Sequence, residues 1–148
     1  MKHKTIKKSI EINAPKEKVW EVLLDDKFTR IWYAEFSEGS HAETDWKIGS
    51  KALFTDNSKT GIVGKIIENK PSELISIGYE GIVGADGIED YESDKAMEVK
   101  GSYETYTLSQ NDEGKTLLSI SCDMAENYFD TMSLAWDKAL LKIKTLSA

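Results

Sequence analysis

The sequence has few of the residues on which disulfides, metal centres and membrane spans depend. Among its 148 residues there are one cysteine and two histidines, and no apolar run approaches the length of a membrane-spanning helix. The single cysteine, Cys122, rules out an internal disulfide and is typical of a reducing compartment, so we expect a cytoplasmic location and no membrane. A metal site needs several His, Cys and carboxylate ligands together. Because His3 is near the terminus and His41 is in a polar segment, we expect no metal and no cofactor.

Positive charge is also scarce. The chain has 19 basic and 26 acidic side chains, which give a net charge of -7 at pH 7. Binding to a phosphate backbone requires clustered Lys and Arg, so we expect no nucleic-acid partner. Hydrophobic residues make up 40% of the chain and charged residues 30%, which is an ordinary globular composition. No repeat, low-complexity segment or Pro/Gly linker divides the sequence. We therefore expect a single domain over residues 1–148.

The most regular pattern in the chain lies between Glu126 and Leu146. Apolar residues recur there every three or four positions, as on one face of a helix: Phe129, Met132, Trp136, Ala139, Ile143 and Leu146. This spacing predicts a long amphipathic helix at the C-terminal end of the sequence. Leu134 and Leu141 lie nearly opposite that face. They are either isolated exposed leucines or a small patch for a partner, so we expect a monomer or a weak homodimer.

The rest of the chain reads mostly as strands. Residues 5–12 alternate as a first strand, and Pro15 then marks the start of a short helix. A second short helix is expected over residues 27–33. Further strands follow at residues 50–55, 62–67, 74–79, 102–109 and 115–124, after residues 36–45, which could form an irregular strand and loop. The predicted fold is α+β, with a curved antiparallel sheet of about six strands wrapped around the long C-terminal helix.

Residues 80–100 interrupt this alternation. They contain Gly81, Gly84 and Gly87 and seven acidic side chains. A connection of this length between strands is either a solvated surface excursion or a functional segment. Residues 93–99 could form one or two helical turns within it.

An ordered series of short motifs resembles the START-like, helix-grip superfamily. The series consists of Ile12-Asn13-Ala14-Pro15 with Val19, Trp20 and Leu23, then Trp32, Trp46-Lys47-Ile48-Gly49, Gly64-Lys65-Ile66, Pro71-Ser72-Glu73-Leu74, the hairpin 106–120, and Trp136 with Leu140 and Ile143. It is most similar to the branch related to the C-terminal domain of the Hsp90 ATPase activator. The resemblance implies an apolar cavity between the sheet and the long helix. It leaves the use of that cavity open among lipid or hormone carriage, polyketide cyclisation and chaperone assistance.

Aromatic, methionine and carboxylate side chains on faces expected to point inward are the candidates for lining such a cavity. They are Trp32, Trp46, Phe54, Tyr79, Glu104, Tyr106, Met124, Phe129, Met132 and Trp136. Each of the apolar ones could equally be ordinary core. Cys122 lies on an apolar strand face, where a lone cysteine is a small buried hydrophobe.

Glu104 has two readings. It shares its strand face with Tyr106 and Leu108, so it could lie inside the cavity and either anchor a polar ligand group or act as a general acid–base. Alternatively, a local bulge could turn it outward.

The sequence predicts a protein that binds a small hydrophobic or amphipathic molecule. One alternative is a protein-interaction role with a chaperone partner, as in the Hsp90 activator, in which the outer surface matters. The other is a cyclase- or hydrolase-like enzyme that uses Glu104 together with Tyr79 or Tyr106. We expect no dedicated catalytic residues, because the sequence has no phosphate-binding glycine loop and no serine-nucleophile motif.

Overall fold

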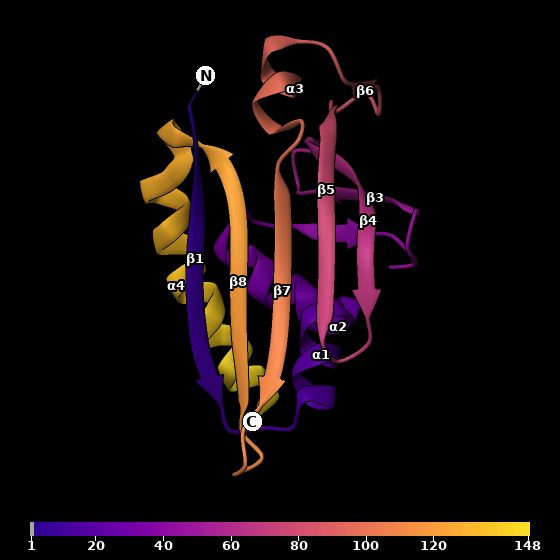
Figure 1. The fold of residues 1–148 in the computed structure, drawn as a ribbon. Helices are drawn as coiled ribbons and strands as arrows, with labels where there is room; N and C mark the ends of the chain where they lie inside the picture. The colour runs from indigo at the N-terminus through magenta and orange to yellow at the C-terminus, as the bar shows by residue number, and fades with distance from the viewer. Residues whose placement is uncertain (1) are drawn as a thin grey trace.

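The computed structural model describes residues 2–148, which form an antiparallel sheet with helices packed against one face (Figure 1). The sheet has eight strands: β1 (His3–Ile12), β2 (His41–Glu43), β3 (Lys51–Thr55), β4 (Gly61–Lys70), β5 (Leu74–Val83), β6 (Glu89–Asp90), β7 (Tyr103–Gln110) and β8 (Thr116–Ala125). The helices are α1 (Lys16–Leu24), α2 (Asp26–Trp32), α3 (Asp94–Val99) and α4 (Phe129–Ser147). Single 3-10 turns, Tyr33–Glu35 and Glu126–Tyr128, follow α2 and precede α4.

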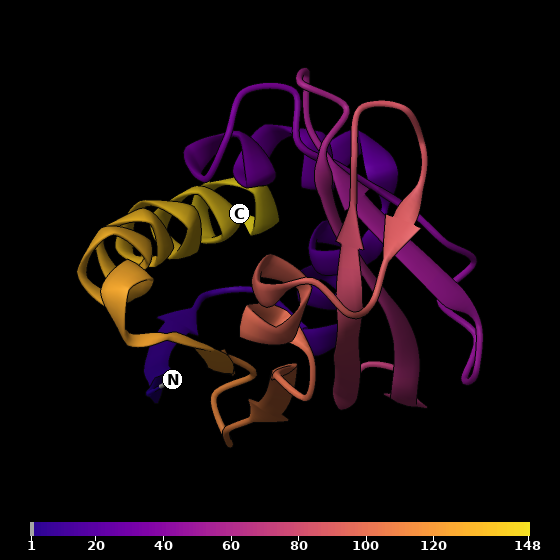
Figure 2. The same cartoon turned by 90° about the horizontal axis from the view of Figure 1, so that it is seen from above.

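The strands are arranged in the order β1-β8-β7-β5-β4-β3-β2, and β6 adds to β5. All neighbouring strands are antiparallel. Seen from above, the sheet curves, and α4 lies on its concave side (Figure 2). The expected α+β architecture is therefore confirmed, although the sheet has eight strands instead of about six. The difference comes from the very short strands β2 and β6, which are too brief to show an alternating pattern.

Buried and exposed side chains alternate along the strands, which fixes the face that each strand turns toward α4. On β8, Leu118, Ile120 and Cys122 are buried. Leu117, which directly precedes Leu118 on the same strand, points to the other face and is 43% exposed. The same alternation on β1 buries Ile6 and Ile12 toward α4. Alternate residues of a strand point to opposite faces, so each strand contributes one face to the core below the helix.

The long helix follows its predicted apolar face, with one change at its start. Trp136, Ala139 and Ile143 are buried against the sheet, as the spacing predicts. Residues 126–128, however, form a 3-10 turn, so the α-helix begins at Phe129. Leu134 and Leu141 are 65% and 61% exposed. That they serve a homodimer stays a prediction.

The excursion at residues 80–100 is more ordered than a loop. Strand β5 continues to Val83, so the first residues of the segment belong to the sheet. The two-residue strand β6 pairs with the end of β5. Helix α3 follows, and the Ser93 side chain accepts a hydrogen bond from the Ala96 amide as its N-cap. The expected helical turns at residues 93–99 are confirmed.

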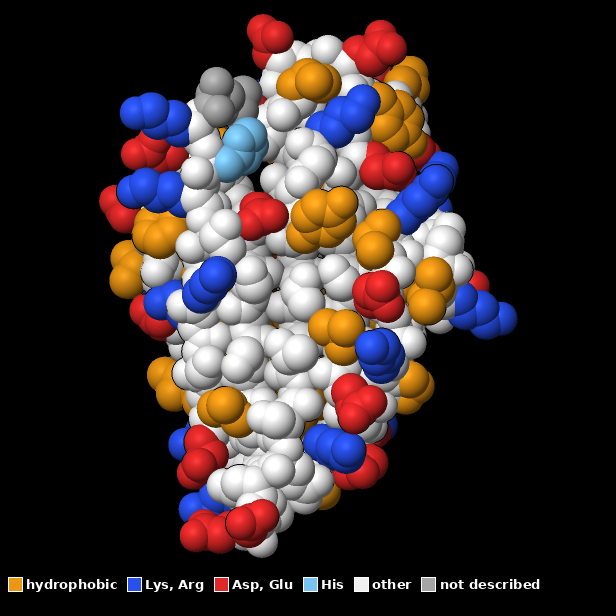
Figure 3. Space-filling model, viewed as in Figure 1, with side chains coloured by type: hydrophobic (Ala, Val, Ile, Leu, Met, Phe, Trp, Pro, Cys, Tyr) orange, Lys and Arg blue, Asp and Glu red, His pale blue; other side chains and the backbone are white. Residues whose placement is uncertain are grey.

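The face of the sheet that points away from α4 carries apolar side chains scattered among charged ones (Figure 3). Ile67, Tyr103 and Leu117 are among the exposed large hydrophobic residues. Single exposed apolar residues of this kind are normal. No helix within residues 2–148 combines the length and the apolar character needed to span a membrane.

Candidate functional site

Two adjoining cavities lie between the concave face of the sheet and α4. The first has a volume of about 200 Å³ and the second of about 330 Å³. Four residues from different elements belong to the walls of both: Ile62 of β4, Tyr79 of β5, Glu104 of β7 and Met132 of α4. The cavities therefore meet at a single carboxylate that is surrounded by apolar and aromatic side chains.

The structure places eight of the ten side chains proposed from the sequence in these walls. Trp32, Phe54, Tyr106 and Trp136 line the first cavity, Met124 lines the second, and Tyr79, Glu104 and Met132 line both. That any of them contacts a ligand stays a prediction.

Trp46 and Phe129 line neither cavity. Trp46 has a positive φ of 63° and packs beside Phe54, with 6.3 Å between the ring centroids. Its backbone lies outside the strands, so strand alternation does not fix its direction. Phe129 is the first residue of α4, where the Lys4 ammonium lies 5.2 Å from its ring centroid. It is partly buried and packs against the core.

Glu104 points inward, because β7 runs in regular register between β5 and β8 with no bulge at this position. Three donors from the neighbouring positions converge on its carboxylate. The Tyr79 hydroxyl donates to Oε1 over 2.8 Å, and the Cys122 thiol donates to the same oxygen over 3.3 Å. The Tyr106 hydroxyl donates to Oε2. A group that accepts on both oxygens is an anchor for polar atoms in an otherwise apolar space.

Burial keeps the three donors protonated. Desolvation, followed by the nearby Glu104 charge, raises the pKa of Tyr79 and of Tyr106 well above the usual value. The same two causes raise the pKa of the Cys122 thiol. Cys122 is therefore a buried thiol, and its setting is not the electropositive one that makes cysteines reactive. The cluster holds a carboxylate in place but has no activated nucleophile.

Sequence reasoning missed part of the first cavity wall. Tyr33 and Phe36 line it from the turn after α2. The Tyr33 and Trp32 rings are in edge contact, with 4.5 Å between centroids, and Phe36 contacts Trp136 in the same way at 4.9 Å. Their positions follow from a non-repeating turn, so no periodic pattern could have shown them. The adjacency to Trp32 was the only signal in the sequence.

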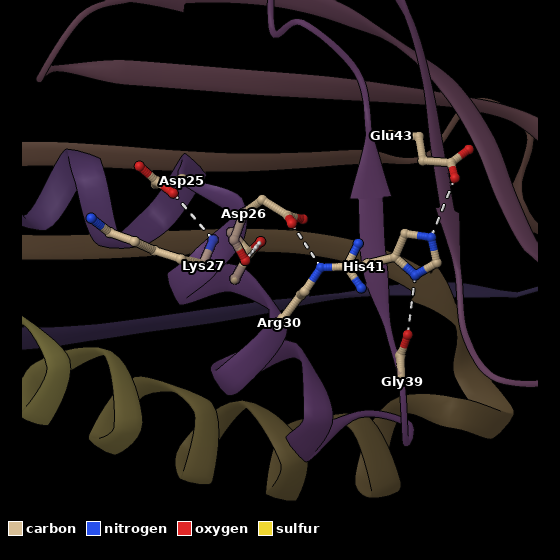
Figure 4. A network of polar contacts seen from close by, with 8 residues as sticks. Asp25, Asp26, Lys27, Arg30, Gly39, His41 and Glu43 are labelled. Atoms are coloured by element: carbon tan, nitrogen blue, oxygen red, sulfur yellow. Dashed lines mark hydrogen bonds and ion pairs between the residues drawn. The ribbon is translucent and has the colours of Figure 1, made fainter.

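Polar residues form one side of the first cavity. His41 of β2 belongs to its wall, and Figure 4 shows the ring held between the Gly39 carbonyl and the Glu43 carboxylate. The distances from the ring nitrogens to these oxygens are 3.1 and 3.4 Å. On the neighbouring helix α2, Arg30 Nε donates to Asp26 Oδ2 over 2.7 Å. The His41 contacts lie within the β2 segment and the Arg30–Asp26 pair lies within α2, so each set orders its own element beside the cavity.

Asp56 lies in the same polar wall. It accepts hydrogen bonds from the Ser37 hydroxyl and from the Ser58 hydroxyl and amide. These hydrogen bonds, the one from Ser37 first, lower the pKa of Asp56. The first cavity therefore has an ionised carboxylate in its polar wall at neutral pH. Within residues 2–148, no three His, Cys, Asp or Glu side chains gather as a metal-binding group.

A sequence model of the family described as Activator of Hsp90 ATPase homolog 1-like protein matches residues 13–147. The chain belongs to this family. A search of curated protein sequences gives no match for this member of the Hsp90 activator-like family.

Solved structures share the fold of this Hsp90 activator-like chain at low sequence identity. The Aha1 dimer from Colwellia psychrerythraea is 16% identical with a TM-score of 0.71, over 95% of this chain and 93% of that one. A protein from Mesorhizobium loti is 14% identical with a TM-score of 0.74, over 97% and 96% of the two chains. CalU16 from Micromonospora echinospora is 17% identical with a TM-score of 0.68, over 99% of this chain and 77% of that one. At these identities the likeness shows the fold alone.

Proposed function

We propose that this chain binds a small, largely apolar molecule in the two adjoining cavities between the sheet and α4. The observation that carries the proposal is the composition of the walls. Aromatic and aliphatic side chains surround one inward carboxylate, Glu104, at the junction of the cavities. A concave apolar site with a few placed polar groups is the usual form of a small-molecule site.

The size of the cavities supports a ring-containing ligand. An engineered apolar cavity of about 150 Å³ is large enough to bind benzene. The first cavity, about 200 Å³, can hold one or two fused rings by that measure. The second, about 330 Å³, offers room for a further apolar part of the same molecule beyond Met132.

The first experiment is native mass spectrometry of gently purified protein, followed by denaturation and identification of any released molecule. A stoichiometric small molecule is the expected result. In the Met132→Trp variant, the larger side chain fills the junction and should abolish this binding. Leu134→Trp is the matched control, because Leu134 is two positions further along α4 and is 65% exposed. A protein that is free of ligand and shows no mass shift with fatty acids, sterols, polyketides or apolar amines would contradict the proposal.

The enzyme alternative uses the same site and predicts a different result. If Glu104 acts as a general acid–base, Glu104→Gln abolishes turnover of the released molecule while its affinity stays within about threefold. We favour a binding protein because the groups next to Glu104 are protonated donors, none of which is an activated nucleophile.

The chaperone alternative depends on the outer surface. It predicts that Met132→Trp changes nothing, whereas substitutions in α3 or β6 abolish capture of the partner. The similar structure from Colwellia psychrerythraea is a dimer, so the same samples should be checked for a homodimer by light scattering. A shift to monomer in Leu134→Lys would assign that contact to the exposed face of α4.

A further inference from the structure

Acidic side chains outnumber basic ones in the walls of both cavities. The first cavity is lined by Asp56 and Glu104, and neither Lys nor Arg is among its wall residues. The second is lined by Glu98, Asp123 and Glu104, with Lys95 as the one cation. The whole chain adds a net charge of -7. A cleft with one sign of charge and low-dielectric walls concentrates ligands of the opposite sign.

Glu104 is held by donors but has no cationic partner. None of the ion pairs within residues 2–148 involves its carboxylate. Its neighbours are the hydroxyls of Tyr79 and Tyr106 and the thiol of Cys122. A carboxylate offers about four lone-pair sites, and Oε2 accepts from Tyr106 alone. One acceptor position therefore stays open on Oε2.

Aromatic rings line the first cavity together with Glu104. Trp32, Tyr106 and Trp136 form a cluster in which each pair of ring centroids is between 5.9 and 6.3 Å apart. On the other side, Phe54 and Tyr79 are in edge contact at 6.2 Å. A cation close to the face of such rings is attracted by their negative quadrupole, and more strongly where water is excluded.

We infer that the ligand is an apolar amine whose protonated nitrogen lies against Glu104 and whose hydrocarbon part lies among the aromatic rings. The inference rests on the proposed binding function and names the chemical class of its ligand. An ammonium group supplies the donor that the open position on Oε2 lacks and the positive charge that Glu104 lacks. A carboxylate ligand such as a fatty acid would face two acids in the first cavity with no Lys or Arg to pair with.

A neutral alcohol is the rival ligand class, and one residue favours it. The indole Nε1 of Trp136 is buried and has no hydrogen-bond partner among residues 2–148. An alcohol oxygen could accept from this N–H and donate to Glu104, whereas an ammonium only donates. We favour the amine because a carboxylate that lacks a cationic partner in a partly buried, mostly apolar cavity costs more than an unpaired neutral N–H.

Isosteric probes separate these classes by isothermal titration calorimetry at neutral pH. The set is 1-naphthylmethylamine, 1-naphthylmethanol, 1-methylnaphthalene and 1-naphthoate, which share one ring system and differ in the polar group. We expect the amine to bind about tenfold or more tightly than 1-methylnaphthalene, by the usual gain of a hydrogen bond to a charged group. The naphthoate should bind more weakly than all the others.

Glu104→Gln tests the residue directly, since it removes the charge and keeps the shape. It should abolish the preference for the amine and leave the affinity for 1-methylnaphthalene unchanged. Glu113→Gln is the matched control. It makes the same change in net charge at an exposed turn between β7 and β8, so it should leave the preference intact.

The possible failures are distinguishable. If none of the four probes binds, the proposed function itself is contradicted. If 1-methylnaphthalene binds and the amine binds no better, or if the alcohol or the naphthoate binds most tightly, the amine inference is wrong while the binding function stands. The comparison of probes on the unaltered protein decides this even if Glu104→Gln does not fold.

Discussion

The Tyr79 hydroxyl on β5 donates a 2.8 Å hydrogen bond to Oε1 of Glu104 on β7. The contact joins two adjacent strands inside a cavity, where water competes less for the carboxylate than it would at the surface. Fold stability and the shape of the candidate site therefore depend on the same polar cluster.

Removing either tyrosine hydroxyl should lower the free energy of unfolding. Hydrogen bonds to charged groups contribute about 1.5–3 kcal/mol, and Glu104 is only partly buried, so we expect a loss of about 1–2 kcal/mol in Tyr79→Phe and in Tyr106→Phe. Urea unfolding measures both. Tyr103→Phe is the control, because Tyr103 is next to Glu104 on β7 but its side chain is 50% exposed. If Tyr103→Phe lowers the free energy of unfolding as much as the other two substitutions, the hydrogen bonds to Glu104 contribute nothing specific.

Alkaline pH should destabilise the protein through three tyrosines of the cavity wall, of which Tyr33 and Tyr106 are buried and Tyr79 is partly buried. Burial, followed by the Glu104 charge, raises the pKa of Tyr33, Tyr79 and Tyr106 above the usual value. In the unfolded chain they titrate near pH 10, so the folded state binds more protons above that pH. The raised pKa values therefore contribute to the free energy of unfolding in full below about pH 10. Above that pH the contribution of the three groups falls by about 4 kcal/mol per pH unit. Unfolding free energies between about pH 9 and pH 11 measure the slope.

Two controls separate the buried tyrosines from the others. Tyr106→Phe should reduce the alkaline slope by about one third, since one of three titrating groups is gone. Tyr91 is exposed, and its hydrogen bond to Glu89 raises the pKa of Tyr91 to about 12. Tyr91→Phe should change the slope less, because an exposed pair is screened by solvent. An unchanged slope in Tyr106→Phe would contradict the assignment.

The buried tryptophans Trp32 and Trp136 differ in the partner of the indole N–H. Trp32 Nε1 donates to the Val22 carbonyl over 2.9 Å, whereas Trp136 Nε1 has no acceptor in the part of the chain that the structure describes. Substitution by Phe leaves a similar void at both sites but breaks a hydrogen bond only at Trp32. We expect Trp32→Phe to cost about 1 kcal/mol more than Trp136→Phe in urea unfolding. Equal losses in the free energy of unfolding for the two substitutions would mean that the Trp136 N–H also donates a hydrogen bond.

Periodicity accounts for the part of this fold that the sequence predicts. On β8, the buried side chains from Thr116 to Met124 lie two positions apart, and those of α4 share one helix face, because burying one face of a strand or helix requires that spacing. The two-residue strand β6 has no period, and it was missed for that reason. Trp46 is partly buried and packs against the core, but it lies outside the strands with a positive φ of 63°, so alternation does not say whether it reaches the cavities.

The site was less predictable than the fold for a similar reason. The inward face of β7 follows from alternation, so Glu104 could be named as a candidate from its strand. Whether that face is packed or leaves a cavity depends on how far α4 lies from the sheet, which no local pattern records. The partner of each polar atom, such as the missing acceptor of Trp136 Nε1, likewise follows only from the three-dimensional contacts.

Gly64 lies on β4 and Gly78 on the adjacent strand β5. Substitution by alanine should lower the stability of the fold by different amounts at the two positions. A Cβ at Gly64 would lie 2.5 Å from the Gly78 carbonyl oxygen, which is backbone and cannot move aside. At Gly78 the new Cβ would lie 3.1 Å from the Ile67 side chain, whose end can rotate. We expect a loss of about 3 kcal/mol for Gly64→Ala and about 1 kcal/mol for Gly78→Ala, measured by thermal unfolding. Because the β4–β5 register shifts at Val63/Gly64, a well-tolerated Gly64→Ala would mean that this irregularity can be rebuilt without glycine.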